Sequence, residues 1–309
     1  MSVTANPASI LVVRLGSMGD IIHTLPAVAS LKTNHPRAHL TWLIEPQWLP
    51  LLEGNPHVDR AITLRRKSLA GLVETWRELR EQPYDLAVDF QGLIKSALCA
   101  RAARPTCIRG FHESLIRERA AALFYSQKTL SSAAHIVDRN MDLALGRGER
   151  VFPVPPGRPE GDLPSGDFVL ASPLAGWRSK QWPMEFYEKL GERLQREAGV
   201  SLVLNGPPDS TLPHRSGIAG LVHATRRAIA VVGVDSGPLH LAAALGKPGV
   251  AIFGPTDPAR NGPYGNSIRV LRAPRAVTTY KRGAEIDESM RRITPEQVFE
   301  SLLAGSWAR

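Results

Sequence analysis

Residues 231–258 constrain the fold more than any other stretch, because they contain a strand, a polar turn, a helix and a second strand in succession. The first apolar run ends in Asp235-Ser236-Gly237, where the backbone must turn, and the helical pattern that follows carries His240. A helix start presents unpaired N–H groups and a positive dipole end to such a turn, which attracts phosphate. The segment therefore predicts a cradle for a nucleotide diphosphate. The alternative is that Asp235 or Ser236 only caps the helix.

Short β-rich runs alternate with helical patterns in both halves of the chain, which is typical of parallel sheets wrapped by helices. In the first half the expected strands are 10–13, 40–44, 61–64 and 86–90, and the expected helices are 21–31, 48–52, 69–79 and 93–102. In the second half a strand is expected at 168–172, a helix at 186–195 and a strand at 202–205. The prolines and glycines of residues 151–164 indicate a linker. We therefore place the domain boundary near residues 150–165, between an N-terminal domain (1–155) and a C-terminal domain (156–309).

Two further segments refine this outline. Between residues 202–210 and 218–224 there is room for only a loop, where an α/β repeat needs a crossover of roughly a dozen residues with a helix. Either the repeat is truncated or a segment near Ser210 is missing. Near the end of the chain, Thr294-Pro295-Glu296-Gln297 has the pattern of a helix cap, so a terminal helix is expected. Whether that helix packs on its own domain or back on the N-terminal domain is left open.

The composition indicates which classes of partner and which compartment to expect. Lys and Arg total 38 against 29 Asp and Glu, a formal charge of +9, which favours an anionic partner such as a nucleotide, nucleic acid, phospholipid surface or phosphorylated glycolipid. The interleaved aromatic and basic residues of nucleic-acid readers are not evident, so no nucleic acid is expected. The two cysteines, Cys99 and Cys107, fit a reducing compartment and exclude a cysteine zinc site. No signal peptide and no run of about 18 apolar residues is found, so we expect a cytoplasmic protein whose membrane contact is peripheral.

The turn after the first strand carries Gly16 and Gly19, followed by Asp20. Two glycines at a strand-to-helix turn let a phosphate or sugar approach the carboxyl edge of a parallel sheet. From this spacing alone, Asp20 is equally explained as the N-cap of the next helix. The string Ser17-Met18-Gly19-Asp20, followed by His23-Thr24-Leu25-Pro26, resembles the bacterial heptosyltransferases, family 9 of the glycosyltransferases. In that family the aspartate is the general base, which implies this role for Asp20.

The resemblance covers nearly the whole chain. Residues 84–96, 117–125 and 135–139 are similar to the N-terminal half of the heptosyltransferase I branch, and residues 180–183 and 235–240 are similar to its donor site. The family implies an α/β chain of the GT-B fold, with two Rossmann-like domains facing across a cleft. The N-terminal domain would bind the acceptor and the C-terminal domain the donor. The implied donor is ADP-heptose, the implied acceptor is Kdo2-lipid A, and no cofactor or metal is expected.

The candidate site residues form two sets. The donor-binding set is Ser17, Gly19, Arg178, Lys180, Asp209, Asp235, Ser236, Gly237 and His240. The acceptor-binding set is Arg65, Arg66, Lys67, Gln91, Lys95, Arg117, His135 and Arg139.

Parts of these two sets have weaker support. Residues 175–179 lack the hydroxyl residues that usually precede the donor lysine in the family, and Asp209 is only a candidate for the carboxylate that binds the donor ribose. A run of cations such as Arg65-Arg66-Lys67 is otherwise a solvated surface, while His23 and Gln91 are equally explained as packing residues.

The expected reaction is transfer of heptose from ADP-heptose to Kdo2-lipid A, with inversion at the anomeric carbon, in synthesis of the lipopolysaccharide inner core. Asp20 would take the proton of the acceptor hydroxyl. Lys180, Arg178 and the helix start at 235–237 would bind the diphosphate and stabilise the departing ADP. We expect a monomer that lies on the anionic inner face of the inner membrane. The alternatives are heptosyltransferase II or another family 9 transferase with a different acceptor, a GT-B sugar-nucleotide epimerase, and a non-catalytic nucleotide- or glycolipid-binding GT-B protein.

Overall fold

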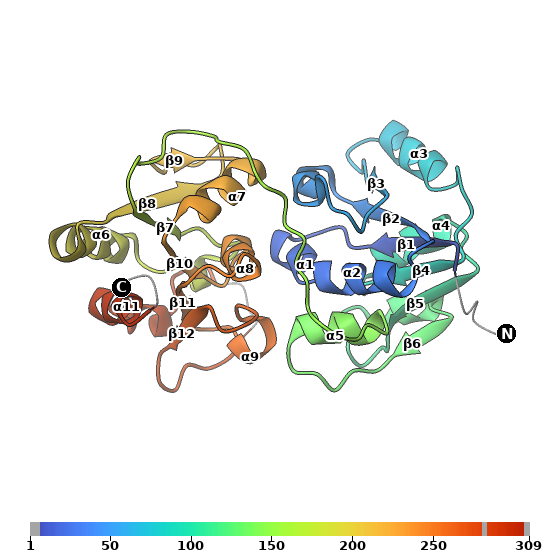
Figure 1. Ribbon diagram of the computed structural model, residues 1–309. Coiled ribbons are helices and arrows are strands. Elements are labelled where there is room, and N and C mark those ends of the chain that lie inside the picture. The colour runs from blue at the N-terminus through green and yellow to red at the C-terminus, as the bar shows by residue number, and fades with distance from the viewer. Residues whose placement is uncertain (1–6, 280–282, 306–309) are drawn as a thin grey trace. The chain divides into compact units, whose positions relative to one another are not determined.

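The computed structural model describes residues 7–279 and 283–305. The chain divides into two compact units, Met1–Pro155 and Pro156–Arg309, and the division falls inside the proline-rich segment 151–164. Each unit is built on one six-stranded sheet whose neighbouring strands all run parallel, with helices packed on its faces (Figure 1). The predicted α/β class is confirmed.

Unit 1 has the strand order β3-β2-β1-β4-β5-β6. Its strands are β1 (Ser9–Val13), β2 (His39–Ile44), β3 (Arg60–Thr63), β4 (Leu86–Asp89), β5 (Cys107–Phe111) and β6 (Gln127–Thr129). Its helices are α1 (Met18–Ile22), α2 (Leu25–Asn34), α3 (Leu69–Glu78), α4 (Ile94–Ala102) and α5 (Ile136–Leu143), with 3₁₀ helices η1 (Pro46–Leu52) and η2 (Arg119–Phe124). The chain order reverses between β1 and β4, so the crevice that binds ligands in such sheets lies at the carboxyl ends of these two strands.

The helix expected over residues 21–31 is two helices, α1 and α2. The side chain of Thr24 donates a hydrogen bond to the carbonyl of Asp20 at 2.8 Å in the break between them. Pro26 lies in the first turn of α2 and has no N–H to continue the bonding of α1. The apolar pattern of the sequence continues through the break, so the pattern alone predicted one helix. The other difference is at 48–52, where the structure has the 3₁₀ helix η1.

Unit 2 has the strand order β12-β11-β10-β7-β8-β9, with its reversal between β7 and β10. Its strands are β7 (Phe168–Ser172), β8 (Ser201–Gly206), β9 (His214–Arg215), β10 (Ala230–Val234), β11 (Gly249–Phe253) and β12 (Ile268–Arg272). Its helices are α6 (Met184–Ala198), α7 (Ile218–Arg227), α8 (Gly237–Ala244), α9 (Pro258–Asn261), α10 (Glu288–Arg291) and α11 (Pro295–Leu303), with the 3₁₀ helix η3 (Arg178–Lys180).

Near Ser210 the connection between β8 and β9 is short and contains no helix. Residues 207–213 join β8 to β9 without a helix, and the two residues of β9 pair with Asn205 and Gly206. The ring of His214 lies 2.7 Å from Asn205 Oδ1, and the carboxylate of Glu160 accepts the backbone N–H of Gly217 at 2.6 Å. The end of the linker therefore binds the segment that follows this connection.

The predicted terminal helix is α11, and its cap forms as expected. The N–H of Thr294 donates to Gln297 Oε1 at 3.0 Å, and the N–H of Gln297 donates to Thr294 Oγ1 at 3.4 Å. Val298, Phe299 and Leu302 bury the apolar face of α11 in the core of unit 2, where the helix packs against α6 and β11. These core contacts place α11 in its own unit. No described helix has the length and apolar character needed to span a bilayer.

Candidate active site

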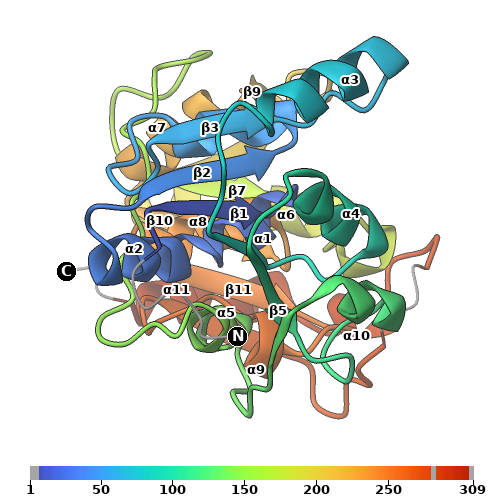
Figure 2. The same ribbon diagram turned by 90° about the vertical axis from the view of Figure 1, so that its right-hand side faces the viewer.

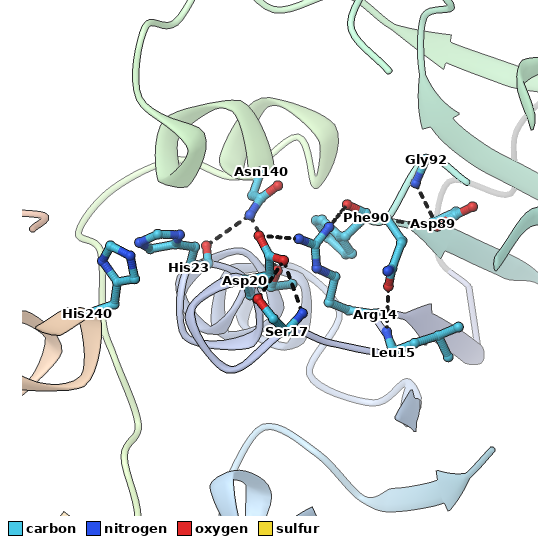
Figure 3. Close-up of polar contacts among 12 residues, drawn as sticks. Arg14, Leu15, Ser17, Asp20, His23, Asp89, Phe90, Gly92, Asn140 and His240 are labelled. Atoms are coloured by element: carbon cyan, nitrogen blue, oxygen red, sulfur yellow. Dashed lines mark hydrogen bonds and ion pairs between the residues drawn. The ribbon is translucent and has the colours of Figure 1, made fainter. Parts of the chain in front are cut away.

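The carboxylate of Asp20 lies in the first turn of α1, at the reversal point of the unit 1 sheet (Figure 3). Its Oδ1 is 2.6 Å from Arg14 Nη2, and its Oδ2 accepts both the N–H and the hydroxyl of Ser17 at 3.0 Å. Its side chain is still 41% exposed. Ser17, not Asp20, is the N-cap of α1, so the reading of Asp20 as an N-cap is wrong. The carboxylate is held by three contacts and remains open to a substrate.

Arg14 is a site residue that sequence reasoning missed. Its guanidinium is buried, and Nη1 donates to the backbone carbonyl of Phe90 at the end of β4 while Nη2 pairs with Asp20. Its own carbonyl accepts the indole N–H of Trp42 at 3.0 Å. The guanidinium therefore ties the carboxyl end of β4 to the Asp20 carboxylate. The available signal was an arginine directly after the apolar run of β1, where buried charge requires a partner.

A buried carboxylate, Asp89, organises the loop after β4. Its Oδ1 accepts the N–H of Gln91 at 2.9 Å and of Gly92 at 3.3 Å, and its Oδ2 accepts the hydroxyls of Ser96 and Tyr125, each at 2.8 Å. Burial raises the pKa of Asp89, and these four hydrogen bonds oppose that rise.

The same loop places the predicted acceptor residue Gln91. Its Oε1 accepts the N–H of Leu15 at 2.8 Å, which joins the loops after β1 and β4. Gly92 has a φ of +67°, and a Cβ there would lie 2.5 Å from the Ile116 side chain, so the loop requires glycine at this position. Gln91 therefore lies at the reversal point of the sheet, and its side-chain oxygen already accepts a backbone hydrogen bond.

The basic loop 65–67 is partly neutralised by acids of unit 1. Arg65 Nη1 lies 2.6 Å from Glu78 and 3.2 Å from Glu74, both on α3, and the hydrogen bond and charge of Glu78 raise the pKa of Arg65. These contacts direct the Arg65 side chain toward α3. Nothing in this geometry directs Arg65 to an acceptor.

Glu45 gathers two more of the predicted acceptor cations. Its Oε1 lies 3.0 Å from Arg66 Nε and 3.8 Å from Lys95 Nζ, so the segment after β3 and the first turn of α4 converge on this carboxylate, which follows β2. Lys67 and Arg117 are exposed. The convergence of Arg66 and Lys95 provides a cationic surface at the carboxyl edge of the sheet.

The remaining predicted acceptor residues lie at the start of α5. The ring of His135 meets that of His23 edge to face, with centroids 5.7 Å apart. Arg139 donates from Nε to the carbonyl of Ala133 at 2.8 Å, and Asn140 donates to the carbonyl of His23 at 3.0 Å. His135 therefore lies beside the turn that follows α1, whereas Arg139 is used to hold the segment before α5.

In unit 2, Lys180 and Asp235 meet at the carboxyl ends of β7 and β10. Lys180 Nζ lies 2.6 Å from Asp235 Oδ2 and 4.4 Å from the centroid of the Trp177 ring, and His240 Nε2 lies 3.4 Å from Asp235 Oδ1. Burial by itself raises the pKa of Asp235, but the hydrogen bond and charge of His240 and then those of Lys180 outweigh it, and the pKa lies well below its usual range. Asp235 is thus an ionised carboxylate that orients two potential phosphate ligands.

Two buried hydroxyls lie on the segments that carry these charges. Ser236 is the N-cap of α8, yet neither its Oγ nor that of Ser179 has a hydrogen-bond partner within the described residues. Capping therefore does not account for the Ser236 hydroxyl. With the N–H groups of the α8 start at Gly237, the two hydroxyls are donors suited to phosphate oxygens.

The other donor candidates are placed as follows. Gly19 lies in α1 of unit 1, and Ser17 is the N-cap of that helix and donates its N–H and hydroxyl to Asp20. Arg178 is exposed at the start of η3, next to the Lys180 site. Asp209 is exposed in the loop after β8. Among residues 7–279 and 283–305, no group of His, Cys, Asp and Glu has the arrangement needed to hold a metal ion.

Comparisons with known proteins identify the family of the chain. The family model of glycosyltransferase family 9 (heptosyltransferase) matches residues 72–225 and 211–288. Lipopolysaccharide heptosyltransferase 1 of Pseudomonas aeruginosa strain PAO1 is 31% identical over 293 residues, which cover 84% of this chain and 82% of that protein. The protein of the same name from Escherichia coli K12 is 28% identical over 308 residues, covering 86% of this chain and 94% of that protein.

Solved structures extend the agreement to the fold. The structure of E. coli heptosyltransferase WaaC with ADP matches with a TM-score of 0.71 and 27% identity, covering 87% of this chain and 96% of that one. E. coli ADP-heptose lipopolysaccharide heptosyltransferase II has the same fold, with a TM-score of 0.77 over 96% of this chain and 98% of that one at 24% identity. The chain therefore belongs to glycosyltransferase family 9, the heptosyltransferases, and is a glycosyltransferase of the GT-B fold class.

Proposed function

We propose that this enzyme transfers heptose from ADP-heptose to Kdo2-lipid A during synthesis of the lipopolysaccharide inner core. The observation that carries the proposal is the Asp20 carboxylate, which is fixed by Arg14 and Ser17 yet exposed at the end of β1. The relatives named lipopolysaccharide heptosyltransferase 1 and the related structure with ADP support the choice of donor and product. The choice of Kdo2-lipid A rests on the family resemblance.

In the proposed reaction, the acceptor hydroxyl attacks the anomeric carbon of the donor heptose. As the new C–O bond forms, Asp20 takes the hydroxyl proton, and the bond from the anomeric carbon to the diphosphate breaks with its electron pair leaving on ADP. General-base assistance of this kind is commonly worth about 10²–10⁴-fold. Attack from the face opposite the departing ADP inverts the anomeric configuration.

The donor diphosphate is assigned to Lys180, the Ser179 and Ser236 hydroxyls and the start of α8. Asp235 is unsuited to bind phosphate because it is ionised, so its role is to hold Lys180 and His240 in place. Positive groups fixed beforehand stabilise the charge that grows on the leaving ADP without reorganisation during the reaction. ADP-heptose is a substrate in this scheme, and the residues assigned to it act without a metal.

The acceptor is assigned to the cationic surface made by Arg66 and Lys95 in unit 1, with His135 beside the α1 turn. Kdo sugars and lipid A phosphates are anionic, and guanidinium and ammonium groups bind carboxylates and phosphates through charge-assisted hydrogen bonds. We further propose that the protein acts as a monomer in the cytoplasm, on the anionic inner face of the inner membrane.

The test is release of ADP from ADP-heptose in the presence of candidate acceptors. We expect ADP release to depend on Kdo2-lipid A and to yield a product one heptose heavier by mass spectrometry. Heptosyl-Kdo2-lipid A is the matched comparison, because a chain acting as heptosyltransferase II would use it in preference. Binding of ADP-heptose without acceptor-dependent release would instead identify a non-catalytic binding protein.

A further inference from the structure

Unit 1 has an apolar groove of about 400 Å³ between α3 and α4. Leu72, Val73 and Trp76 line it from α3, and Leu98, Cys99 and Ala102 line it from α4. Leu64, Thr75 and Leu79, which are buried, also line it, so the partly exposed apolar side chains of α3 border a groove that reaches the core of unit 1. In Figure 2, α3 projects beyond the β3 edge of the sheet, next to α4.

The side chains of this groove are more exposed than packing alone explains. Leu72, Val73 and Trp76, which line the groove, are all exposed, and Leu69, one turn earlier on α3, is 82% exposed. Single exposed apolar residues are ordinary, but a contiguous set around a groove marks an interaction surface.

Arginines gather at one end of the groove. Arg80 stacks over the Trp76 ring at 3.9 Å and donates from Nε to the carbonyl of Ala102 at 2.9 Å, so it bridges the ends of α3 and α4. Arg77, Arg101 and Arg104 lie within a turn of the same two helix ends and are exposed.

The acids beside this end are already paired. Glu78 is 2.6 Å from Arg65, and Glu81 is 2.6 Å from Arg60. Within the described residues, none of the four arginines at the helix ends forms an ion pair. The end of the groove therefore carries uncompensated positive charge next to an apolar channel.

We propose that this groove binds an anionic phospholipid of the bilayer, with an acyl chain between α3 and α4 and the headgroup phosphate at the arginines. The proposal rests on the proposed function, since a lipid-linked acceptor brings the enzyme to a membrane. Apolar side chains that enter the acyl boundary, a Trp at the interface and nearby cations are the elements of interfacial membrane binding. The surface lies in the unit assigned to the acceptor.

Co-sedimentation with vesicles tests the proposal without any enzyme assay. We expect wild type to bind vesicles of phosphatidylcholine with phosphatidylglycerol and to bind pure phosphatidylcholine much more weakly. The variant Leu72→Gln with Val73→Gln should lose about tenfold in affinity, because it removes part of the buried apolar area of two side chains. Its matched control is Leu130→Gln with Val151→Gln, two exposed apolar residues of unit 1 outside the groove, which should bind as wild type does.

A second pair of variants tests the charge separately. Arg77→Gln with Arg101→Gln should lose roughly thirtyfold on the anionic vesicles, at about 1 kcal/mol for each cation near the surface. Arg37→Gln with Arg147→Gln, also exposed in unit 1, should lose much less. Brominated acyl chains should quench tryptophan fluorescence in wild type more than in Trp76→Phe.

Three results would overturn the proposal: equal binding to both vesicle types, groove variants with wild-type affinity, or a lipid-free wild-type dimer that Leu72→Gln with Val73→Gln converts to a monomer. The last result would show that the groove is a subunit interface. Turnover with a deacylated, soluble Kdo-containing acceptor keeps the two proposals apart. It should be unchanged in the groove variants, whereas its absence in wild type would count against the proposed reaction and not against the lipid groove.

Discussion

Asp20 meets two requirements of a general base that usually conflict, because it is fixed in position and still open to solvent. Arg14 and Ser17 hold its two oxygens, and its side chain is still exposed, as the proposed proton transfer from an acceptor hydroxyl requires. Substitutions at Arg14, Lys180 and Asp235 test separately what each of these side chains contributes.

Arg14 should act through Asp20. In Arg14→Lys the single ammonium cannot hold both the Phe90 carbonyl and the Asp20 carboxylate as the guanidinium does. We expect kcat to fall by about 10²-fold, the size of effect caused by misplacing a reacting group by about 1 Å, while KM for donor and acceptor stays within about twofold. Steady-state kinetics measures both constants. A variant with wild-type kcat would show that Asp20 needs no such support.

Lys180 should contribute to donor binding. Lys180→Met keeps the apolar stem and removes the charge, and a hydrogen bond to a charged group is worth about 1.5–3 kcal/mol. ADP affinity measured by calorimetry should therefore fall roughly 10- to 100-fold. Lys189→Met, an exposed lysine on α6 of the same unit, is the control and should bind ADP normally. Equal affinities for the two variants would remove Lys180 from the donor site.

Asp235 should stabilise unit 2 in a pH-dependent way. Its pKa is lower in the folded protein than in the unfolded chain, where it is about 3.9, so its stabilisation is present above that value and is lost as the pH falls. The difference in unfolding free energy between wild type and Asp235→Asn should shrink by about 1.4 kcal/mol per pH unit below about pH 4. Urea titrations at pH 6, 4 and 3 measure it. A difference that stays constant over these pH values would show that the charge of Asp235 adds no stability.

Hydrogen bonds join the loop after β1 to the loop after β4. Asp89 holds the backbone of Gln91 and Gly92, and Gln91 in turn binds the N–H of Leu15. The buried carboxylate is anchored from the far side by Tyr125, which comes from the segment between η2 and β6. The stability of these loops therefore depends on a contact between residues that are distant in sequence.

Tyr125→Phe tests this anchor. It removes the hydroxyl that donates to Asp89 at 2.8 Å, and should lower the unfolding free energy by about 1.5–3 kcal/mol in a denaturant titration. Tyr84→Phe is a matched control in the same core cluster, because the Tyr84 hydroxyl is buried without a hydrogen-bond partner within the described residues. Its removal should be neutral or slightly stabilising. Similar losses in both variants would mean that the Asp89 contact adds nothing beyond packing.

The sequence predicted the regular elements well where a pattern is local. The strand at 168–172 and the capped terminal helix have the predicted form, because apolar runs and cap residues act over a few positions. The break between α1 and α2 escaped because it depends on Thr24 and Pro26 inside a continuous apolar pattern.

Both units have the same sheet topology, and this explains where Asp20 and the Lys180–Asp235 pair lie. Each sheet reverses its order once, and Asp20 and the Lys180–Asp235 pair lie at the carboxyl ends of the strands that flank these reversals. The sequence placed these three residues through motifs. It did not find Arg14 or Asp89, because their roles depend on the partners Phe90 and Tyr125, which only the fold brings near.

The kcat of Asp20→Asn shows whether Asp20 is the general base of the proposed glycosyl transfer. Asn keeps the size of the side chain but has no carboxylate to take the proton. We expect kcat with ADP-heptose and Kdo2-lipid A to fall by at least about 10²-fold, with ADP affinity within about twofold of wild type, since the groups assigned to the diphosphate lie in unit 2. A folded Asp20→Asn enzyme whose kcat stays within a few-fold of wild type would show that Asp20 is not the general base.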